Sequence, residues 1–200
     1  ADDIQAMADI AEGALKAGAL GFSTSRTVLH RTAEGEVVPG TYAGSAEMLG
    51  IASGIAKAGH GILQMASDME DEVYELGWMG QLSKQYGVPV SMNVFQRDSD
   101  PEKYRRVLHG MQQVNAEGAQ VSGQVSGRTA GLLLSLDGTI HPFQSKPSYR
   151  EIRRLPKPER IALMRDPEMR EKIISEERIK GRGGELAKMF LEGWHKMFRL

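Results

Sequence analysis

Four helical patterns in this sequence each end at a glycine, and a short apolar segment follows each glycine almost at once. The helical patterns cover residues 3–17, 45–58, 68–86 and 101–117, and the apolar segments cover 19–23, 61–65, 88–95 and 119–125. A helix followed by a strand at intervals of ~30 to 40 residues is typical of repeated βα units. The pattern therefore favours an α/β fold with a parallel sheet and right-handed crossovers.

A complete barrel of eight such units needs about 250 residues, and this chain has 200. We therefore expect residues 1–145 to form part of a TIM (β/α) barrel, as one arc of its ring of strands. Residues 146–200 are richer in charge and predict helices at about 157–165, 167–180 and 184–198. This helical segment is expected to be an insertion or an outer cover of the same domain. Because the chain begins at Ala1 without methionine, we expect an internal piece of a longer protein.

The composition is that of an ordinary globular protein, with 40% hydrophobic and 26% charged residues and a net charge of −1. This balance gives no reason to expect nucleic acid or an anionic membrane as a partner. The chain has no cysteine, which excludes disulfides and thiolate metal ligands and fits a cytoplasmic location. The expected partners are a small-molecule substrate, the remainder of the barrel and, through unpaired sheet edges, a second copy of the chain.

The first apolar segment leads into two hydroxyl side chains, Ser23 and Thr24, and then into a polar loop over residues 25–43. In parallel α/β proteins, ligands bind at the carboxyl ends of the strands. Ser23 and Thr24 are therefore candidate substrate-binding residues. Neither has a recognisable base nearby in the sequence, so a serine nucleophile is not expected there.

Amide side chains lie at or near the ends of the later predicted strands. Gln64, Gln96 and Gln124 occupy comparable places, and Asn93 lies close to them. One interpretation is a ring of amide donors and acceptors that orients a carboxylate or amide substrate. The other is that these amides end the strands by hydrogen bonding to loops, and the sequence leaves both open.

Charged residues follow the strand ends as well. Arg97 and Arg128, together with Arg26, could present a guanidinium to a substrate carboxylate, and we expect one of the three to do so. Asp68 could ligate a metal through oxygen, although capping of the next helix is the favoured interpretation.

Two of the five histidines could reach the same end of the sheet. His30 lies in the long loop after the first strand, and His141 follows the fourth strand. Each is a weak candidate for acid–base catalysis or metal ligation, while the other three histidines are expected to be structural.

Two strings of residues resemble a known family. Residues 17–25 (AGALGFSTS) and 39–43 (PGTYA) are similar to the N-acyl-D-amino-acid deacylase, or D-aminoacylase, branch of the amidohydrolase superfamily. The helix–strand rhythm extends the likeness loosely to about residue 145. The resemblance implies a metal-dependent hydrolase on a TIM barrel, in which a zinc-bound water attacks the amide of an N-acyl amino acid. It also implies that zinc, or another divalent metal, is bound mainly by residues outside this chain.

The sequence departs from that family where two metal-binding histidines are expected. The strand that should end in His-x-Arg contains Gln64, the one that should end in Ser-His contains Asn93, and Gln124 stands where an acidic motif is expected. Glutamine is a poor zinc ligand because its carbonyl lacks the basic lone pair of imidazole. We therefore expect a divergent subgroup.

Two main hypotheses for function follow. The first is that the chain is part of a metal-dependent amidohydrolase, which hydrolyses a C–N bond of an N-acyl amino acid or related amide, and that this piece alone is inactive. The alternative is a non-catalytic α/β domain that binds a small molecule and has lost the metal histidines. A different hydrolase or lyase reaction at the same end of the sheet is a third possibility.

Overall fold

The computed structural model describes residues 2–32, 36–128, 131, 133–138, 141–179 and 196–198. It divides the chain into two compact units, with the boundary between residues 129 and 130. The first unit holds the sheet and the second is helical, and each is described by itself below.

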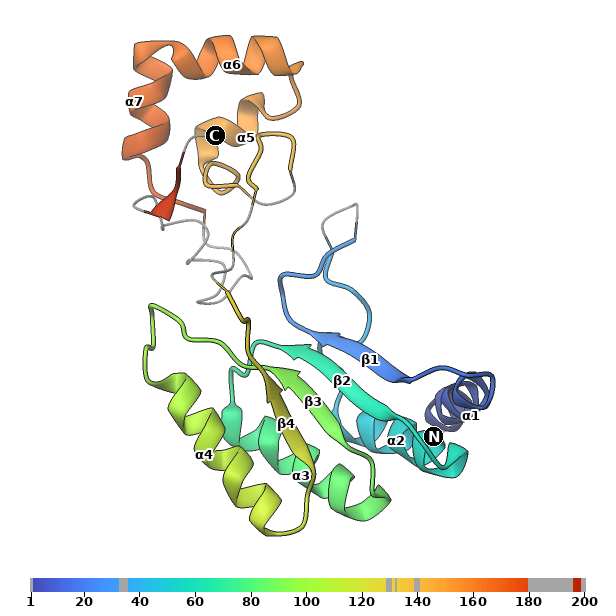
Figure 1. Ribbon diagram of the computed structural model, residues 1–200. Helices are drawn as coiled ribbons and strands as arrows, with labels where there is room; N and C mark the ends of the chain where they lie inside the picture. Colours follow the sequence, from blue (N-terminus) through green and yellow to red (C-terminus); the bar gives the residue numbers. More distant parts are fainter. Residues whose placement is uncertain are drawn as a thin grey trace. The chain divides into compact units, whose positions relative to one another are not determined.

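The first unit is built on a four-stranded parallel sheet with the strand order β1-β2-β3-β4 (Figure 1). The strands are β1 (Gly21–Arg26), β2 (Ile62–Ser67), β3 (Val90–Asn93) and β4 (Val121–Gln124). The helices are α1 (Asp2–Lys16), α2 (Ser45–Ala58), α3 (Glu72–Tyr86) and α4 (Lys103–Ala116). Consecutive strands are neighbours and each pair is joined through a helix, so the predicted parallel α/β fold is confirmed. The arrangement is consistent with an arc of a TIM barrel.

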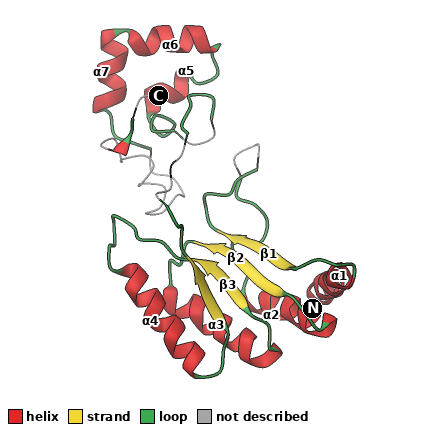
Figure 2. Ribbon diagram, in the orientation of Figure 1, coloured by secondary structure: helices red, strands yellow, loops and turns green. Residues whose placement is uncertain are grey.

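The four helices lie along one face of the sheet (Figure 2). Alternate strand residues point toward them and form the core, among them Leu63, Met65, Val90 and Met92, all with 0% exposure. Because successive side chains in a strand point to opposite faces, the remaining strand residues lie on the face without helices. That second face carries hydroxyl and amide groups, and it is where the candidate site is found.

Two glycines let α1 and α2 pack closely. A Cβ atom on Gly50 would lie 2.1 Å from Cγ2 of Ile4, and one on Gly54 would lie 2.0 Å from the carbonyl oxygen of Ala8. Real Cβ contacts essentially never fall below 3.0 Å. Only glycine therefore permits this approach of the two helix backbones.

The predicted helix ends agree with the structure better than the predicted strand ends. α2 has the predicted bounds, and Gly59 and Gly87 end α2 and α3 with φ of 80° and 67°, a left-handed conformation that favours glycine. In contrast, the strand predicted at residues 19–23 is β1, which continues to Arg26. The two hydroxyl residues expected at its end, Ser23 and Thr24, therefore lie inside the strand and point to opposite faces.

The second unit contains α5 (Pro147–Ile152), α6 (Lys157–Arg165) and α7 (Pro167–Ser175). Its small core is made by Tyr149, Ile152 and Ile173, and Phe143 packs against it. The unit accordingly starts before residue 146, the point from which the sequence predicted a charged, helical segment. α6 has the predicted bounds, α7 ends at Ser175 instead of 180, and α5 was not predicted.

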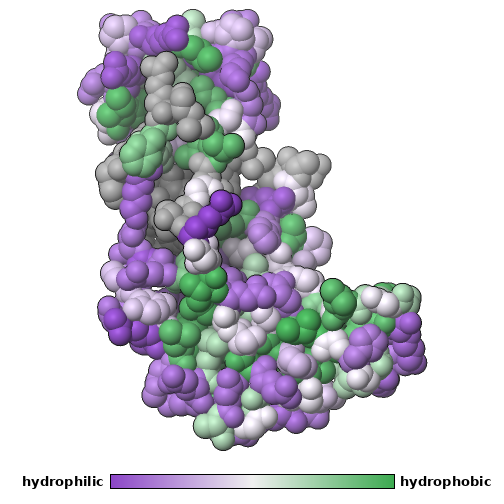
Figure 3. All heavy atoms as spheres, viewed as in Figure 1, coloured by the Kyte–Doolittle hydropathy of each residue, from purple (hydrophilic) through white to green (hydrophobic). Residues whose placement is uncertain are grey.

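Most of the helix predicted at 184–198 lies outside the described residues. The surface over α6 is largely hydrophilic, as its many charged residues indicate (Figure 3). No helix within the described ranges is both long enough and apolar enough to span a membrane.

Candidate functional site

One register row of the sheet places four polar residues side by side on the face without helices. Ser23 pairs with Gln64 and Gln64 with Ser91, and Ser91 pairs with Ser122. We call these four residues the polar row. It contains no charged side chain, which distinguishes it from an ion-binding or phosphate-binding surface.

The polar row is held by hydrogen bonds between neighbouring strands. The hydroxyl of Ser23 donates to Oε1 of Gln64 at 2.5 Å, and the hydroxyl of Ser122 donates to the carbonyl oxygen of Val90 at 3.2 Å. Gln64 is the one long side chain of the row, and the bond from Ser23 fixes which way its amide faces. The described residues provide no acceptor for Nε2 of Gln64, so this N–H₂ group can donate to a ligand.

Thr24 does not belong to the polar row. It pairs with Met65, a core residue, and so it points toward the helices. A Cβ atom on Gly40 would lie 3.8 Å from the Thr24 hydroxyl, which places Thr24 beside the β1–α2 loop. The structure thus separates Ser23 and Thr24, which the sequence treated as a pair.

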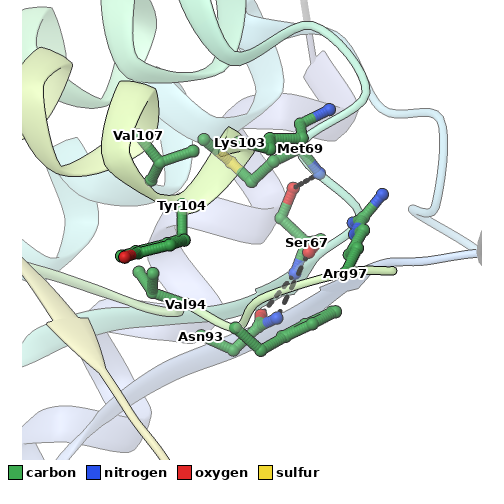
Figure 4. A pocket seen from close by; sticks show the side chains of 9 residues that line it. Ser67, Met69, Asn93, Val94, Arg97, Lys103, Tyr104 and Val107 are labelled. Atoms are coloured by element: carbon green, nitrogen blue, oxygen red, sulfur yellow. Dashed lines mark hydrogen bonds between the residues drawn. The ribbon is translucent and has the colours of Figure 1, made fainter. Parts of the chain in front are cut away.

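Asn93 closes the carboxyl end of the sheet instead of facing a ligand. Its Oδ1 accepts from the N–H of Ser67 at 2.8 Å, and its Nδ2 donates to the carbonyl oxygen of Ser67 at 3.3 Å (Figure 4). The side chain therefore continues the pairing of β2 and β3 beyond the backbone ladder. For Asn93, the strand-ending interpretation describes what its amide does.

The other two glutamines lie apart from Gln64. Gln96 is exposed beyond β3, and its Nε2 donates to the carbonyl oxygen of Pro101 at 3.2 Å, within the loop that leads to α4. Gln124 is exposed at the end of β4, where it pairs in register with Asn93. The three glutamines thus occupy three different levels along the strands, and only Gln64 lies in the polar row.

A small pocket lies at the carboxyl ends of β2 and β3 and is bordered by the first turns of α4 (Figure 4). Arg97, with 7% exposure, lines it. Its guanidinium stacks on Phe95 at 5.2 Å from the ring centroid, and one nitrogen donates to the carbonyl oxygen of Asp68. Arg97 is therefore a buried guanidinium held at the carboxyl end of the sheet.

The other two arginine candidates differ from Arg97. Arg26 is buried against α3, where it forms a bidentate ion pair with Glu75 at 2.6 and 2.9 Å and also donates to the carbonyl oxygen of Ala43 at 2.6 Å. These bonds engage three of its nitrogens, so it stabilises the fold. Arg128 is exposed in a turn after β4, and its backbone N–H lies 3.5 Å from the Ser126 hydroxyl.

Asp68 does not cap α3, and the favoured sequence interpretation is wrong. The cap is Asp71, whose side chain accepts from the N–H of Tyr74 at 2.9 Å. Asp68 is 5% exposed, and its Oδ2 accepts from the N–H of Val28 at 2.9 Å, which anchors the loop after β1. Its Oδ1 is buried and has no hydrogen-bond partner among the described residues.

A zinc site needs three or four ligands of the histidine, cysteine or carboxylate type, and the described ranges contain no group of three such residues. Asp68 offers one buried carboxylate oxygen and nothing more. The described part of the chain therefore does not fit a complete metal site.

The two candidate histidines lie in different units. His141 is buried in the second unit, where its ring packs edge-on against Tyr149 at 4.8 Å between centroids and its Nδ1 accepts from the N–H of Phe143 at 3.3 Å. Burial lowers the pKa of His141 below its ordinary value, since the charged ring would lose hydration. These contacts make it part of a core.

His30 is exposed, and its Nδ1 lies 2.5 Å from the hydroxyl oxygen of Ser25. The sequence analysis assigned Ser23 and Thr24 to substrate binding, expected no serine nucleophile there, and did not consider Ser25. The available signal was a serine at the end of a strand with a histidine five residues later, a spacing at which a loop can fold back.

Comparisons with known proteins gave two similar solved structures. No protein-family model matches the chain, and no curated protein matches it. A D-aminoacylase described as defining a novel subset of amidohydrolases is 24% identical, with a TM-score of 0.49, over 65% of this chain and 26% of its own length. A D-aminoacylase variant in complex with CuCl₂ is 24% identical with a TM-score of 0.49, over 68% of this chain and 28% of its own. The chain thus spans about a quarter of these proteins.

Proposed function

We propose that the protein is an amidohydrolase that hydrolyses the C–N bond of an N-acyl amino acid or a related amide. In this proposal the polar row binds the amide group of the substrate. The observation that carries it is the Ser23–Gln64 pair, which presents a fixed amide donor on the uncovered face of the sheet. The strings at residues 17–25 and 39–43, which resemble the D-aminoacylase branch, support the same reaction class.

The chemistry of the row suits a neutral, planar amide. An amide carbonyl accepts hydrogen bonds, which Nε2 of Gln64 can donate, and the row holds no charge that would have to be neutralised. Arg97 can complement the free carboxylate of an acyl amino acid, since a guanidinium has five N–H donors and the hydrogen bond to the carbonyl oxygen of Asp68 engages one of its nitrogens. Amide and carboxylate would then be recognised by different residues of the first unit.

A divalent metal, with zinc as the first choice, remains part of this proposal for the whole protein. Because the described residues supply no cluster of ligands, we assign the metal to residues outside this chain.

The same observation favours one second candidate, a small-molecule-binding α/β domain without hydrolytic activity. Such a domain would use the polar row in the same way and release the ligand unchanged.

The test uses the full-length gene product, N-acetyl-D-amino acids and added Zn²⁺, with release of the free amino acid as the readout. We expect turnover, and we expect Gln64→Met to lower kcat/KM by about tenfold, since one hydrogen bond to the substrate is lost. Gln112→Met is the matched control, because Gln112 is an exposed glutamine on α4, and it should leave kcat/KM unchanged.

The outcomes separate the two candidates. If calorimetry shows that the acyl amino acid binds but no product is released, the hydrolase proposal is wrong and the protein is a binding domain. If kcat/KM is equal in Gln64→Met and Gln112→Met, the polar row does not bind the substrate.

A further inference from the structure

The end of β1 brings a hydroxyl and an imidazole together on the face of the sheet that carries the polar row. Ser25 is the second-last residue of β1 and is half-buried, and it lies on the same side of the strand as Ser23. Its hydroxyl oxygen is 2.5 Å from Nδ1 of His30. When the ring proton is on Nε2, Nδ1 accepts the serine hydrogen. This is the contact by which a base activates a serine.

Two further bonds hold the loop that carries His30. The buried carboxylate of Asp68 accepts from the N–H of Val28 at 2.9 Å, and the carbonyl oxygen of His30 accepts from the N–H of Val38 at 3.3 Å. The loop is thus fixed on both sides of its first turn, so the histidine is positioned before any substrate arrives. A nucleophile and base that are already in position raise the rate because little ordering is left to be done.

We propose that Ser25 and His30 form a nucleophile–base pair that takes the acyl group of a small carboxylic ester. In the first step Ser25 Oγ bonds to the carbonyl carbon, the ester C–O bond breaks, and the proton passes through His30 Nδ1 to the departing alkoxide. In the second step water attacks the acyl-serine, His30 accepts its proton and returns it to Ser25 Oγ, and the carboxylic acid leaves. Both steps balance with water as the one co-reactant.

The neighbouring strand supplies a donor and room for this reaction. Ser25 pairs in register with Ala66, whose methyl group is the smallest side chain on this face of β2, and Gln64 lies diagonally behind it. Oε1 of Gln64 accepts from Ser23, and in this proposal Nε2 of the same amide donates to the developing oxyanion. Ala66 leaves space beside Ser25 for a small acyl group, which is why we assign a short ester.

The pair does not depend on the proposed metal-assisted amide hydrolysis. Its nucleophile is a serine and its base is an imidazole, and neither needs a metal ion to react. Reactivity that persists in a chelator therefore tests this pair alone, while amide turnover with Zn²⁺ tests the proposed function alone.

The experiment treats the protein with diisopropyl fluorophosphate in EDTA and follows modification of each serine by peptide mass spectrometry. Attack on phosphorus forms a serine–O–P bond and releases fluoride, so the adduct marks an activated serine. We expect Ser25 to be modified at least 100-fold faster than Ser175, an exposed serine on α7 that donates to a carbonyl oxygen. p-Nitrophenyl acetate should protect Ser25 and release p-nitrophenolate.

Variants separate chemistry from folding. His30→Gln should lower the rate at Ser25 by about 100-fold, because general-base catalysis contributes roughly that much or more. His60→Gln, at an exposed histidine in the turn before β2, should leave the rate unchanged. A rate at Ser25 no greater than at Ser175, or one that His30→Gln does not change while p-nitrophenyl acetate gives no protection, would overturn the proposal.

Discussion

Replacing one glycine at the contact of α1 and α2 should destabilise the first unit, whereas the same change on α3 should stabilise it. At Gly54 a Cβ atom would lie 2.0 Å from the backbone oxygen of Ala8, but at Gly77 nothing lies within 4 Å. Alanine improves helix propensity by about 1 kcal/mol at either site. At Gly54 this gain is opposed by a clash with a backbone atom that no side-chain rotation can relieve.

The magnitude follows from that clash. To restore an ordinary contact, the two helices must separate by roughly 1 Å, which weakens dispersion contacts all along their interface. Overpacking of this kind costs about 3 kcal/mol or more when backbone has to move. We therefore expect Gly54→Ala to lower the free energy of unfolding by about 2 kcal/mol and Gly77→Ala to raise it by about 1 kcal/mol.

The assay is urea unfolding followed by the fluorescence of Trp78, which is buried in α3. Replacing the second tryptophan, Trp194, by phenylalanine in all variants leaves Trp78 as the one reporter. Equal free energies of unfolding for Gly54→Ala and Gly77→Ala would refute the packing of α1 on α2 described above.

Three further predictions concern polar groups that are buried or half-buried. Arg26→Met should lower the free energy of unfolding by about 3–5 kcal/mol, because it leaves the Glu75 carboxylate buried without its partner. Adding Glu75→Leu to this variant should restore most of the lost stability, as measured by the same urea assay. Asn93→Leu should cost about 1–3 kcal/mol there, since both backbone groups of Ser67 lose their partner. Burial lowers the pKa of His141 from its ordinary value of 6.5, so the unfolded chain binds its proton first. The stability of the second unit should accordingly be full above pH 6.5 and fall as the pH drops through the pKa of the folded state. Thermal unfolding across that range should show this, and His141→Phe should remove the dependence.

The sequence predicted those structural features that depend on residues close to one another along the chain. The helices were found from their apolar spacing and their final glycines, and α2 and α6 have the predicted bounds. The parallel sheet followed from the order of helices and strands, because a helix crossover returns the chain in the same direction.

Features that depend on distant partners were missed. The strand β1 was expected at residues 19–23, where the apolar segment ends, but it continues to Arg26. The charge of Arg26 is paired with Glu75, 49 positions later, and nothing near Arg26 in the sequence indicates that partner. Asp68 was interpreted as a cap because it comes just before a predicted helix, whereas its partner, the N–H of Val28, lies 40 positions earlier in the sequence. The Ser25–His30 contact depends on the fold of a loop, which residue spacing alone does not determine.

The most direct test of the account is whether neighbouring strands place the polar row on one face of the sheet. The protein has no cysteine, so pairs can be introduced and bridged with dibromobimane, which fluoresces strongly once it links two thiols. We predict rapid bridging in the variant Ser23→Cys with Gln64→Cys, whose residues are register partners. The variant Ser23→Cys with Leu63→Cys, whose side chains lie on opposite faces, should not be bridged in the folded protein. Bridging of the second pair as fast as the first would contradict the parallel register and, with it, the site built on that face.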